Sequence, residues 1–151
     1  MSDSLSLPIA RIQKIIISFV IDDIVITLFF IFIIYDQFSA VFSNIMVFDE
    51  AALEGINTFF TQSLLVVLSI KLIYHTVLVW QNGMTLGKYF MKIKVIDLET
   101  GDTPGFQKAF LRASVRIPSE VLFYVGFLMA FFVPLRQTLH DKIANCVVVN
   151  D

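Results

Sequence analysis

Residues 15–34, IIISFVIDDIVITLFFIFII, decide the fold of this 151-residue chain. About 20 consecutive apolar residues are needed to cross a bilayer as a helix, so this run predicts a membrane-spanning segment. Asp22 and Asp23 lie near its middle, where an acidic side chain costs roughly 2.5–3.5 kcal/mol on insertion scales. Because such residues usually face a partner inside the membrane, they are the first candidate functional residues.

The composition of the whole chain agrees with a membrane protein. Hydrophobic residues make up 57% of the sequence, charged residues only 16%, and the mean hydropathy is +0.80. This is more apolar surface than one soluble core of this size needs. We therefore expect an all-α integral membrane protein with a single domain over residues 1–151. Cys146 is the only cysteine, which excludes an internal disulfide and argues against a thiolate metal site.

Three apolar segments follow one another, at residues 12–35, 59–80 and 117–135. The connection between the first two contains Asp49, Glu50 and Glu54 but no Lys or Arg, whereas the connection at residues 81–116 carries six basic residues. By the positive-inside rule, the N-terminus and the second connection are cytoplasmic and the acidic loop is external. The sequence thus predicts a multi-pass protein with a cytoplasmic N-terminus.

The third apolar segment has two readings. It carries Pro118, Glu120, Gly126 and Pro134, and basic residues flank both of its ends. A straight helix over it reaches roughly 27 Å, which is marginal for a bilayer. It either spans the membrane or breaks near Gly126 and re-enters on the same side, where neighbouring helices shield the broken backbone. We favour the re-entrant form.

The cytoplasmic part is expected to contain two strands and one basic helix. Residues 92–98, KIKVIDL, and residues 146–149 are short β-branched runs that need each other for stability. If they pair, both lie in the cytoplasm, as a re-entrant third segment allows. Residues 106–116 place Lys108, Arg112 and Arg116 four apart on one helical face, which suits binding to an anionic leaflet. An ordinary solvated helix is the alternative.

Helical spacing predicts a polar cluster inside the membrane. In the first segment Arg11, Lys14, Ser18 and Asp22 share one face, while Asp23 is turned about 100° away. In the second segment Lys71 and His75 share a face. We expect Asp22 or Asp23 to pair with Lys71, because a paired set is far cheaper than isolated buried charges. The predicted members are Arg11, Lys14, Asp22, Asp23, Lys71, His75 and Glu120.

Several short motifs carry a family resemblance. They are Gly83-Met84-Thr85-Leu86-Gly87-Lys88, Lys94-Val95-Ile96-Asp97, Arg112, and Arg136-Gln137-Thr138-Leu139-His140-Asp141-Lys142-Ile143-Ala144 with Val147-Val148-Val149. The set resembles the RDD family of membrane proteins over nearly the whole chain. That family is named for one arginine and one aspartate in the first helix and a second aspartate near the C-terminus.

The resemblance implies positions for the naming residues. Asp22 or Asp23 looks like the first aspartate, Asp141 is similar to the second, and Arg11 or Lys14 stands near the place of the arginine. It also implies a bacterial inner-membrane protein, with monovalent cation/proton antiport proposed for some members. The cytoplasmic motif residues implied are Gly83, Thr85, Gly87, Lys88, Arg112, Arg136, His140 and Asp141.

No motif indicates an enzyme, a metal site or a cofactor. His140 and Asp141 are adjacent but lack a nearby third ligand, and no Ser or Cys has an identifiable base at motif spacing. An aromatic RNA-binding pattern is missing, so nucleic acid is not an expected partner. Two functions stay open. We rank first a non-catalytic accessory or assembly subunit in a larger or homo-oligomeric complex, and second an ion/proton antiporter that uses an intramembrane aspartate.

Overall fold

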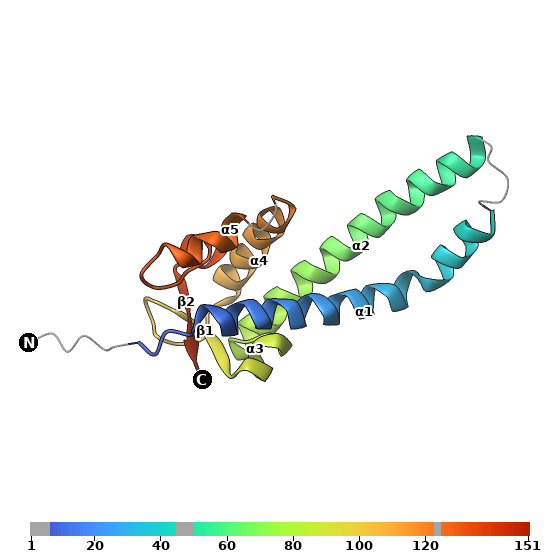
Figure 1. The fold of residues 1–151 in the computed structure, drawn as a ribbon. Coiled ribbons are helices and arrows are strands. Elements are labelled where there is room, and N and C mark those ends of the chain that lie inside the picture. The colour runs from blue at the N-terminus through green and yellow to red at the C-terminus, as the bar shows by residue number, and fades with distance from the viewer. Residues whose placement is uncertain (1–6, 45–49, 123–124) are drawn as a thin grey trace, which may run out of the picture. The chain divides into compact units, whose positions relative to one another are not determined.

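A computed structural model describes residues 7–44, 50–122 and 125–151. Figure 1 follows its elements along the chain. They are α1 (Ile12–Asn44), α2 (Glu50–Asn82), α3 (Leu86–Met91), β1 (Ile93–Asp97), α4 (Phe106–Val121), α5 (Val125–Leu128), the 3-10 helix η1 (Met129–Phe131), α6 (Leu139–Ile143) and β2 (Cys146–Asn150). The fold is mostly helical with one small sheet, as expected.

Helices α1 and α2 are each 33 residues long. Within the described residues they are the two helices long and apolar enough to cross a membrane. Both extend beyond the predicted spans, because the connection expected at residues 36–57 is largely helical. The described part of that connection contains no proline, and Gly55 costs a helix only about 1 kcal/mol. The predicted loop is therefore shorter than expected. Asp49 lies outside the described residues, and the external location of the loop stays a prediction.

The chain divides into two compact units, unit 1 (Met1–Asp22 with Leu72–Asp151) and unit 2 (Asp23–Lys71). Unit 2 contains α1 from Asp23 onward and α2 up to Lys71. In this unit the ring centres of Phe38 and Phe59 lie 6.1 Å apart. Unit 1 contains the remaining elements. The prediction of one domain stays a prediction.

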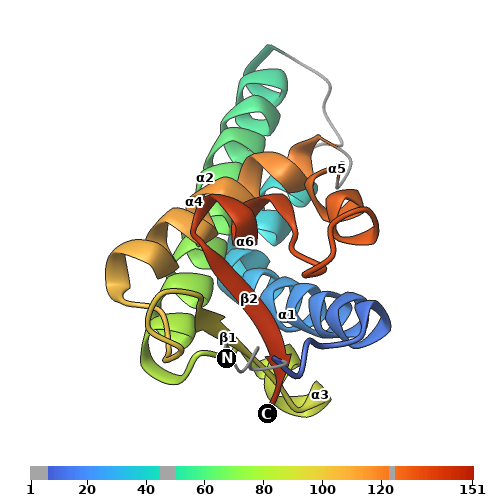
Figure 2. The ribbon, with the colours of Figure 1, turned by 90° about the vertical axis from the view of Figure 1, so that its left-hand side faces the viewer.

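The sheet in unit 1 confirms the predicted strand pairing. β1 and β2 run antiparallel, with Val95 opposite Val148, and both strands are almost entirely buried. Ile9, just before α1, forms a single bridge to Val149, so the start of the chain adds to the edge of the sheet (Figure 2). The core beneath is formed by Ala10, Ile15, Phe19, Val79, Ile93, Val95, Ala109, Ala144, Cys146 and Val148.

The third apolar segment does not form one continuous helix over its described residues. Helix α4 runs through Pro118 to Val121, and α5 then packs back against α4. Gly126 makes this reversal possible, since a Cβ there would lie only 2.6 Å from Ser119 Oγ. A single spanning helix is thus replaced by a broken, reversing segment. Re-entry into a membrane remains a prediction.

Candidate functional site

Asp22 of α1 holds the segment that follows α2. Its side chain is completely buried, and Oδ1 accepts hydrogen bonds from Tyr74 OH and the Gly87 backbone N–H, both at 2.8 Å. Oδ2 accepts one from Thr85 Oγ1 at 2.6 Å. Three donors compensate a carboxylate for the loss of water. The first-helix aspartate therefore anchors the N-terminus of α3 rather than pairing with Lys71.

Gly87 is required by the closeness of this contact. A Cβ at Gly87 would overlap the backbone oxygen of Ser18 and lie 2.9 Å from Asp22 Oδ1. Glycine is the residue that permits such a close approach of two backbones. In the motif Thr85-Leu86-Gly87-Lys88, Thr85 thus donates to Asp22 and Gly87 permits the close contact with α1. The next residue, Lys88, is buried.

Lys88 carries a buried amine next to an aromatic ring. Its side chain is 0% exposed, and Nζ has no hydrogen-bond partner among the described residues. The amine lies 4.8 Å from the centre of the Phe19 ring, a cation–π distance. Burial lowers the pKa of Lys88 to about 7, and the nearby Arg112 charge acts in the same direction while Asp22 opposes it. Lys88 therefore exchanges its proton near neutral pH.

Replacing Lys88 with methionine should change how stability depends on pH. In the parent, the unfolded chain binds a proton at Lys88 up to pH 10.5, whereas the folded chain binds it only up to about pH 7. Stability therefore rises by about 1.4 kcal/mol per pH unit from pH 7 to about pH 9, above which the raised pKa of Cys146 acts in the opposite direction. The K88M variant should lose this slope and be more stable at pH 7, as measured by thermal unfolding in detergent. The exposed Lys142→Met is the control; a parent curve flat from pH 7 to 9 contradicts the assignment.

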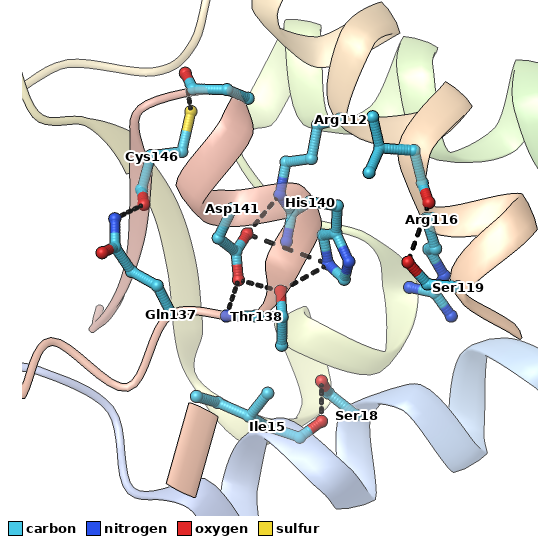
Figure 3. A network of polar contacts seen from close by, with 12 residues as sticks. Ile15, Ser18, Arg112, Arg116, Ser119, Gln137, Thr138, His140, Asp141 and Cys146 are labelled. Atoms are coloured by element: carbon cyan, nitrogen blue, oxygen red, sulfur yellow. Dashed lines mark hydrogen bonds and ion pairs between the residues drawn. The ribbon is translucent and has the colours of Figure 1, made fainter. Parts of the chain in front are cut away.

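Arg112 of α4 and Asp141 of α6 form a buried ion pair (Figure 3). Arg112 Nε donates to Asp141 Oδ1 at 2.5 Å, and the two side chains are 3% and 0% exposed. Thr138 completes the site, because its hydroxyl donates to Asp141 Oδ2 at 2.6 Å. The two residues also form the capping box that starts α6, in which the Thr138 backbone N–H donates to Asp141 Oδ2 at 3.3 Å. Burial alone would raise the pKa of Asp141, but the Arg112 charge and the hydrogen bonds from Thr138 and Arg112 together outweigh burial and hold that pKa below its usual value.

His140 and Cys146 are also buried in unit 1. His140 Nε2 lies 2.9 Å from Thr138 Oγ1, and burial lowers the pKa of His140, so the ring stays neutral. Burial raises the pKa of Cys146 to about 11, which keeps it a thiol. Gln137 Nε2 donates to the Cys146 carbonyl at 2.7 Å and ties β2 to the start of α6 (Figure 3). Across the described residues, no group of three or more His, Cys, Asp or Glu could hold a metal.

Arg116 lies one turn along α4 from Arg112. Its Nε donates to Glu120 Oε1 at 2.7 Å, and its guanidinium carbon lies 4.7 Å from the centre of the Phe19 ring. The Phe19 ring thus has the Lys88 amine and the Arg116 guanidinium within 5 Å of its centre. Unit 1 therefore encloses basic and acidic side chains together, namely Lys88, Arg112, Arg116, Asp22, Glu120 and Asp141.

Lys71 pairs with Asp23, the neighbour of Asp22, in unit 2. Lys71 Nζ lies 3.5 Å from Asp23 Oδ1, and the side chains are 20% and 30% exposed. Because consecutive helical residues are turned about 100° apart, one aspartate faces Lys71 while the other faces α3. The sequence left Asp22 and Asp23 open as partners of Lys71, and the structure pairs Lys71 with Asp23.

The remaining predicted residues have local roles. Arg11 is exposed, and Lys14 Nζ donates to Asn150 Oδ1 at 3.0 Å. His75 is buried, and neither ring nitrogen has a hydrogen-bond partner among the described residues. Arg136 adopts a left-handed backbone with φ 50° and donates to the Ala10 carbonyl at 3.3 Å. Gly83, with φ 69°, lies against the Val95 carbonyl.

The basic helix was predicted with the wrong orientation. Arg112 and Arg116 face inward, and Lys108 pairs with Asp97 and Glu99 at 2.8 and 2.9 Å. The cause is the acceptors inside the protein, since Asp141 of α6 and Glu120 of α4 itself bind the two arginines. Sequence analysis did not identify Tyr74, and it named Thr138 only as part of a family motif without a role. The spacing of Arg112, Arg116 and Glu120 by four residues was the available signal for an internally paired face.

Comparison with known proteins finds relatives that are similar to part of this chain. A proline-rich antigen homolog of Mycobacterium tuberculosis is 36% identical over 67 residues, 44% of this chain and 28% of the relative. The proline-rich antigen of Mycobacterium leprae is 38% identical over 66 residues, 44% of this chain and 26% of the relative. An uncharacterized protein of Rickettsia prowazekii is 30% identical over 70 residues, 46% and 38% of the two chains. The chain thus matches well under half the length of each relative, and no solved structure matches it.

The sequence model of one family covers most of the chain. It is described as the RDD family and matches residues 11–145. The matched region includes Asp22 and Asp141 and the segment between them, the parts that form the buried contacts of unit 1. This protein belongs to the RDD family, a family of membrane proteins.

Proposed function

We propose that the chain is a non-catalytic membrane subunit that packs within a larger or homo-oligomeric membrane complex. The observation that carries this is the outer surface of the two long helices. Phe32, Phe60 and Leu65 are 83%, 67% and 61% exposed, as expected for helices that have lipid or other helices as neighbours. Two helices do not enclose a transport path, which transporters build between helical repeats.

A groove in unit 2 offers a place for a partner helix. It has a volume of about 480 Å³ and is lined by residues of both helices: Gln37, Ala40, Val41, Ala51, Glu54, Gly55, Thr58, Phe59 and Gln62. Small residues let helix backbones approach closely, and the amides of Gln37 and Gln62 can hydrogen-bond across such a contact. We take the occupant to be a helix of another membrane-embedded subunit or of a second copy.

The chemistry of unit 1 supports a non-catalytic role. The Thr85 and Thr138 hydroxyls donate to carboxylates inside closed contacts, and both residues are only 1% exposed, so a substrate does not reach them. Cys146 is buried and protonated at neutral pH. In this proposal the buried charged side chains of unit 1 stabilise the fold and take no part in a reaction. The location that goes with it is the bacterial inner membrane, with the N-terminus in the cytoplasm on the positive-inside rule.

Filling the groove tests the assembly role. A tagged Gly55→Leu variant should fold like the parent, since a Cβ at Gly55 meets nothing within 4 Å, but it should lose partners that co-purify from native membranes. Leu64→Phe is the matched control, because it adds volume at a 56% exposed position on the same helix. If the parent purifies as a monomer without partners after mild crosslinking in the membrane, the subunit proposal is wrong.

Cation/proton exchange is the second candidate. Asp23 favours it, because its carboxylate lies in an apolar helix and keeps 30% exposure at a long 3.5 Å distance from Lys71. Purified chain in proteoliposomes with a pH gradient would show exchange that Asp23→Asn abolishes and the exposed Asp36→Asn leaves intact. That result would replace the first proposal, and the absence of exchange would count against Asp23 as a carrier carboxylate.

A further inference from the structure

Helix α4 buries its arginines and exposes phenylalanines, the reverse of a helix on the surface of a soluble protein. Its two arginines, Arg112 and Arg116, are 3% and 2% exposed, whereas Phe106 and Phe110 are 51% and 44% exposed. A surface helix in water buries its apolar stripe and exposes its charges. The reversed arrangement indicates that the medium outside α4 is apolar.

The outer side of α4 carries few groups that need water. The four charged side chains of the helix all take part in ion pairs: Lys108 with Asp97 and Glu99, Arg112 with Asp141, and Arg116 with Glu120 within the helix. The outer hydroxyl of Ser114 donates to the Phe110 carbonyl of its own helix at 2.9 Å. A side chain satisfied in this way does not depend on solvent.

The apolar surface continues beyond α4. Leu122, Leu128, Phe131 and Phe132 are 64%, 54%, 56% and 86% exposed. We define the α4–η1 segment by its described residues, 106–122 and 125–132. We call the following set its outer apolar residues: Phe106, Phe110, Leu111, Leu122, Leu128, Phe131 and Phe132. Apolar exposure on this scale is uncommon on soluble monomers and usually marks an interaction with protein or membrane.

We propose that the α4–η1 segment lies in the boundary between lipid headgroups and acyl chains and inserts these outer apolar residues into one leaflet. The proposal rests on the membrane assignment of the family and does not depend on the proposed subunit role. The occupant is lipid because the aromatic surface is continuous with a membrane-crossing helix: Trp80 near the end of α2 lies 5.4 Å from the Phe106 ring, which stacks on Phe110 at 6.2 Å. Trp and Phe side chains are typical of this boundary.

The contact needs no anionic lipid. Arg112 and Arg116 are enclosed by unit 1 and cannot reach a phosphate group. Insertion then depends on apolar area, which zwitterionic lipids accept as well as anionic ones. This separates the inferred contact from the electrostatic binding that the basic spacing of α4 suggested.

The single tryptophan of the chain makes a direct test possible. In a Trp80→Phe background, Phe110→Trp and Phe132→Trp each place the probe on the proposed surface, and Asp102→Trp places it in an exposed turn as the matched control. The full chain is reconstituted at low protein-to-lipid ratio in phosphatidylcholine vesicles brominated either near the headgroup or deep in the acyl chains.

The expected result is a large loss of tryptophan emission in the Phe110→Trp and Phe132→Trp variants. The loss should be greater with shallow than with deep bromines, since interfacial helices bury their apolar face about 5–10 Å. The Asp102→Trp control should keep its emission.

Two outcomes overturn the proposal. In the first, the two surface variants are quenched no more than the Asp102→Trp control. In the second, bromines quench them in the monomer but not in crosslinked dimers, which would assign the surface to contact with a second copy of the chain. Loss of co-purifying partners in the Gly55→Leu variant leaves this readout unaffected, so the two proposals fail separately.

Discussion

Replacing Asp141 with alanine should lower the free energy of unfolding by about 3–5 kcal/mol, the usual range when one partner of a buried ion pair is removed. Arg112 is 3% exposed and would keep its charge without a carboxylate at its Nε. The Thr138 hydroxyl and backbone N–H would lose their acceptor as well, so α6 would lose one half of its capping box. Thermal unfolding in detergent, followed by Trp80 fluorescence, measures the loss.

Two further variants show whether the loss comes from the stranded charge. Removing Asp151, which pairs with Lys94 where both side chains are more than one-third exposed, should change stability by less than about 1 kcal/mol. The double variant Arg112→Met with Asp141→Leu should recover much of the loss, since an apolar pair leaves no buried charge. A double variant as unstable as Asp141→Ala would show that packing, and not the charge, dominates.

Gly87→Ala is expected to be the most damaging of the glycine-to-alanine substitutions at described positions. The added Cβ would overlap the Ser18 carbonyl oxygen, which belongs to the backbone and cannot rotate away. Relief requires α3 to move from α1, which breaks the bond from the Gly87 N–H to Asp22 and leaves a buried carboxylate short of a donor. Overpacking of this kind costs typically about 1–3 kcal/mol, and the lost donor adds to it.

Gly55→Ala on the long helix α2 is the matched control. A Cβ there meets nothing within 4 Å, so the substitution should be neutral or stabilising by up to about 1 kcal/mol through helix propensity. Hydrogen exchange of the amides of residues 87–89 would localise the damage in the first variant. Equal unfolding temperatures for Gly87→Ala and Gly55→Ala would show that α3 does not pack on α1 as described.

The membrane helices and the sheet could be predicted because their signals are local. About twenty apolar residues in a row and two short β-branched runs restrict the backbone wherever they occur. The helix ends were less predictable, since residues 36–57 have the composition of a loop but few residues that stop a helix. The broken third segment was half predicted: Pro118 and Gly126 indicated a break, whereas the return of α5 onto α4 depends on the fit between Gly126 and Ser119.

The polar contacts show the same division. Sequence spacing placed Lys71 opposite the aspartates of α1, but whether Asp22 or Asp23 is its partner depends on a rotation of about 100°. The structure decides this through Tyr74, Thr85 and Gly87, which bring three donors to Asp22 and leave Asp23 for Lys71. The orientation of α4 was predicted wrongly for a related reason, because a repeat of basic residues does not reveal where their carboxylate partners lie.

The order of residues along the chain determined three features: that this is a membrane protein, that it has two long apolar helices, and which strands pair. Hydrophobicity and backbone preference act over a few neighbouring residues, so the sequence alone carries these signals. The choice of partner for each buried charge followed only from tertiary structure. Asp23 and Lys71, or Arg112 and Asp141, are separated by tens of residues in sequence, and each of these pairs forms because folding brings its two residues together at a site partly or fully shielded from water.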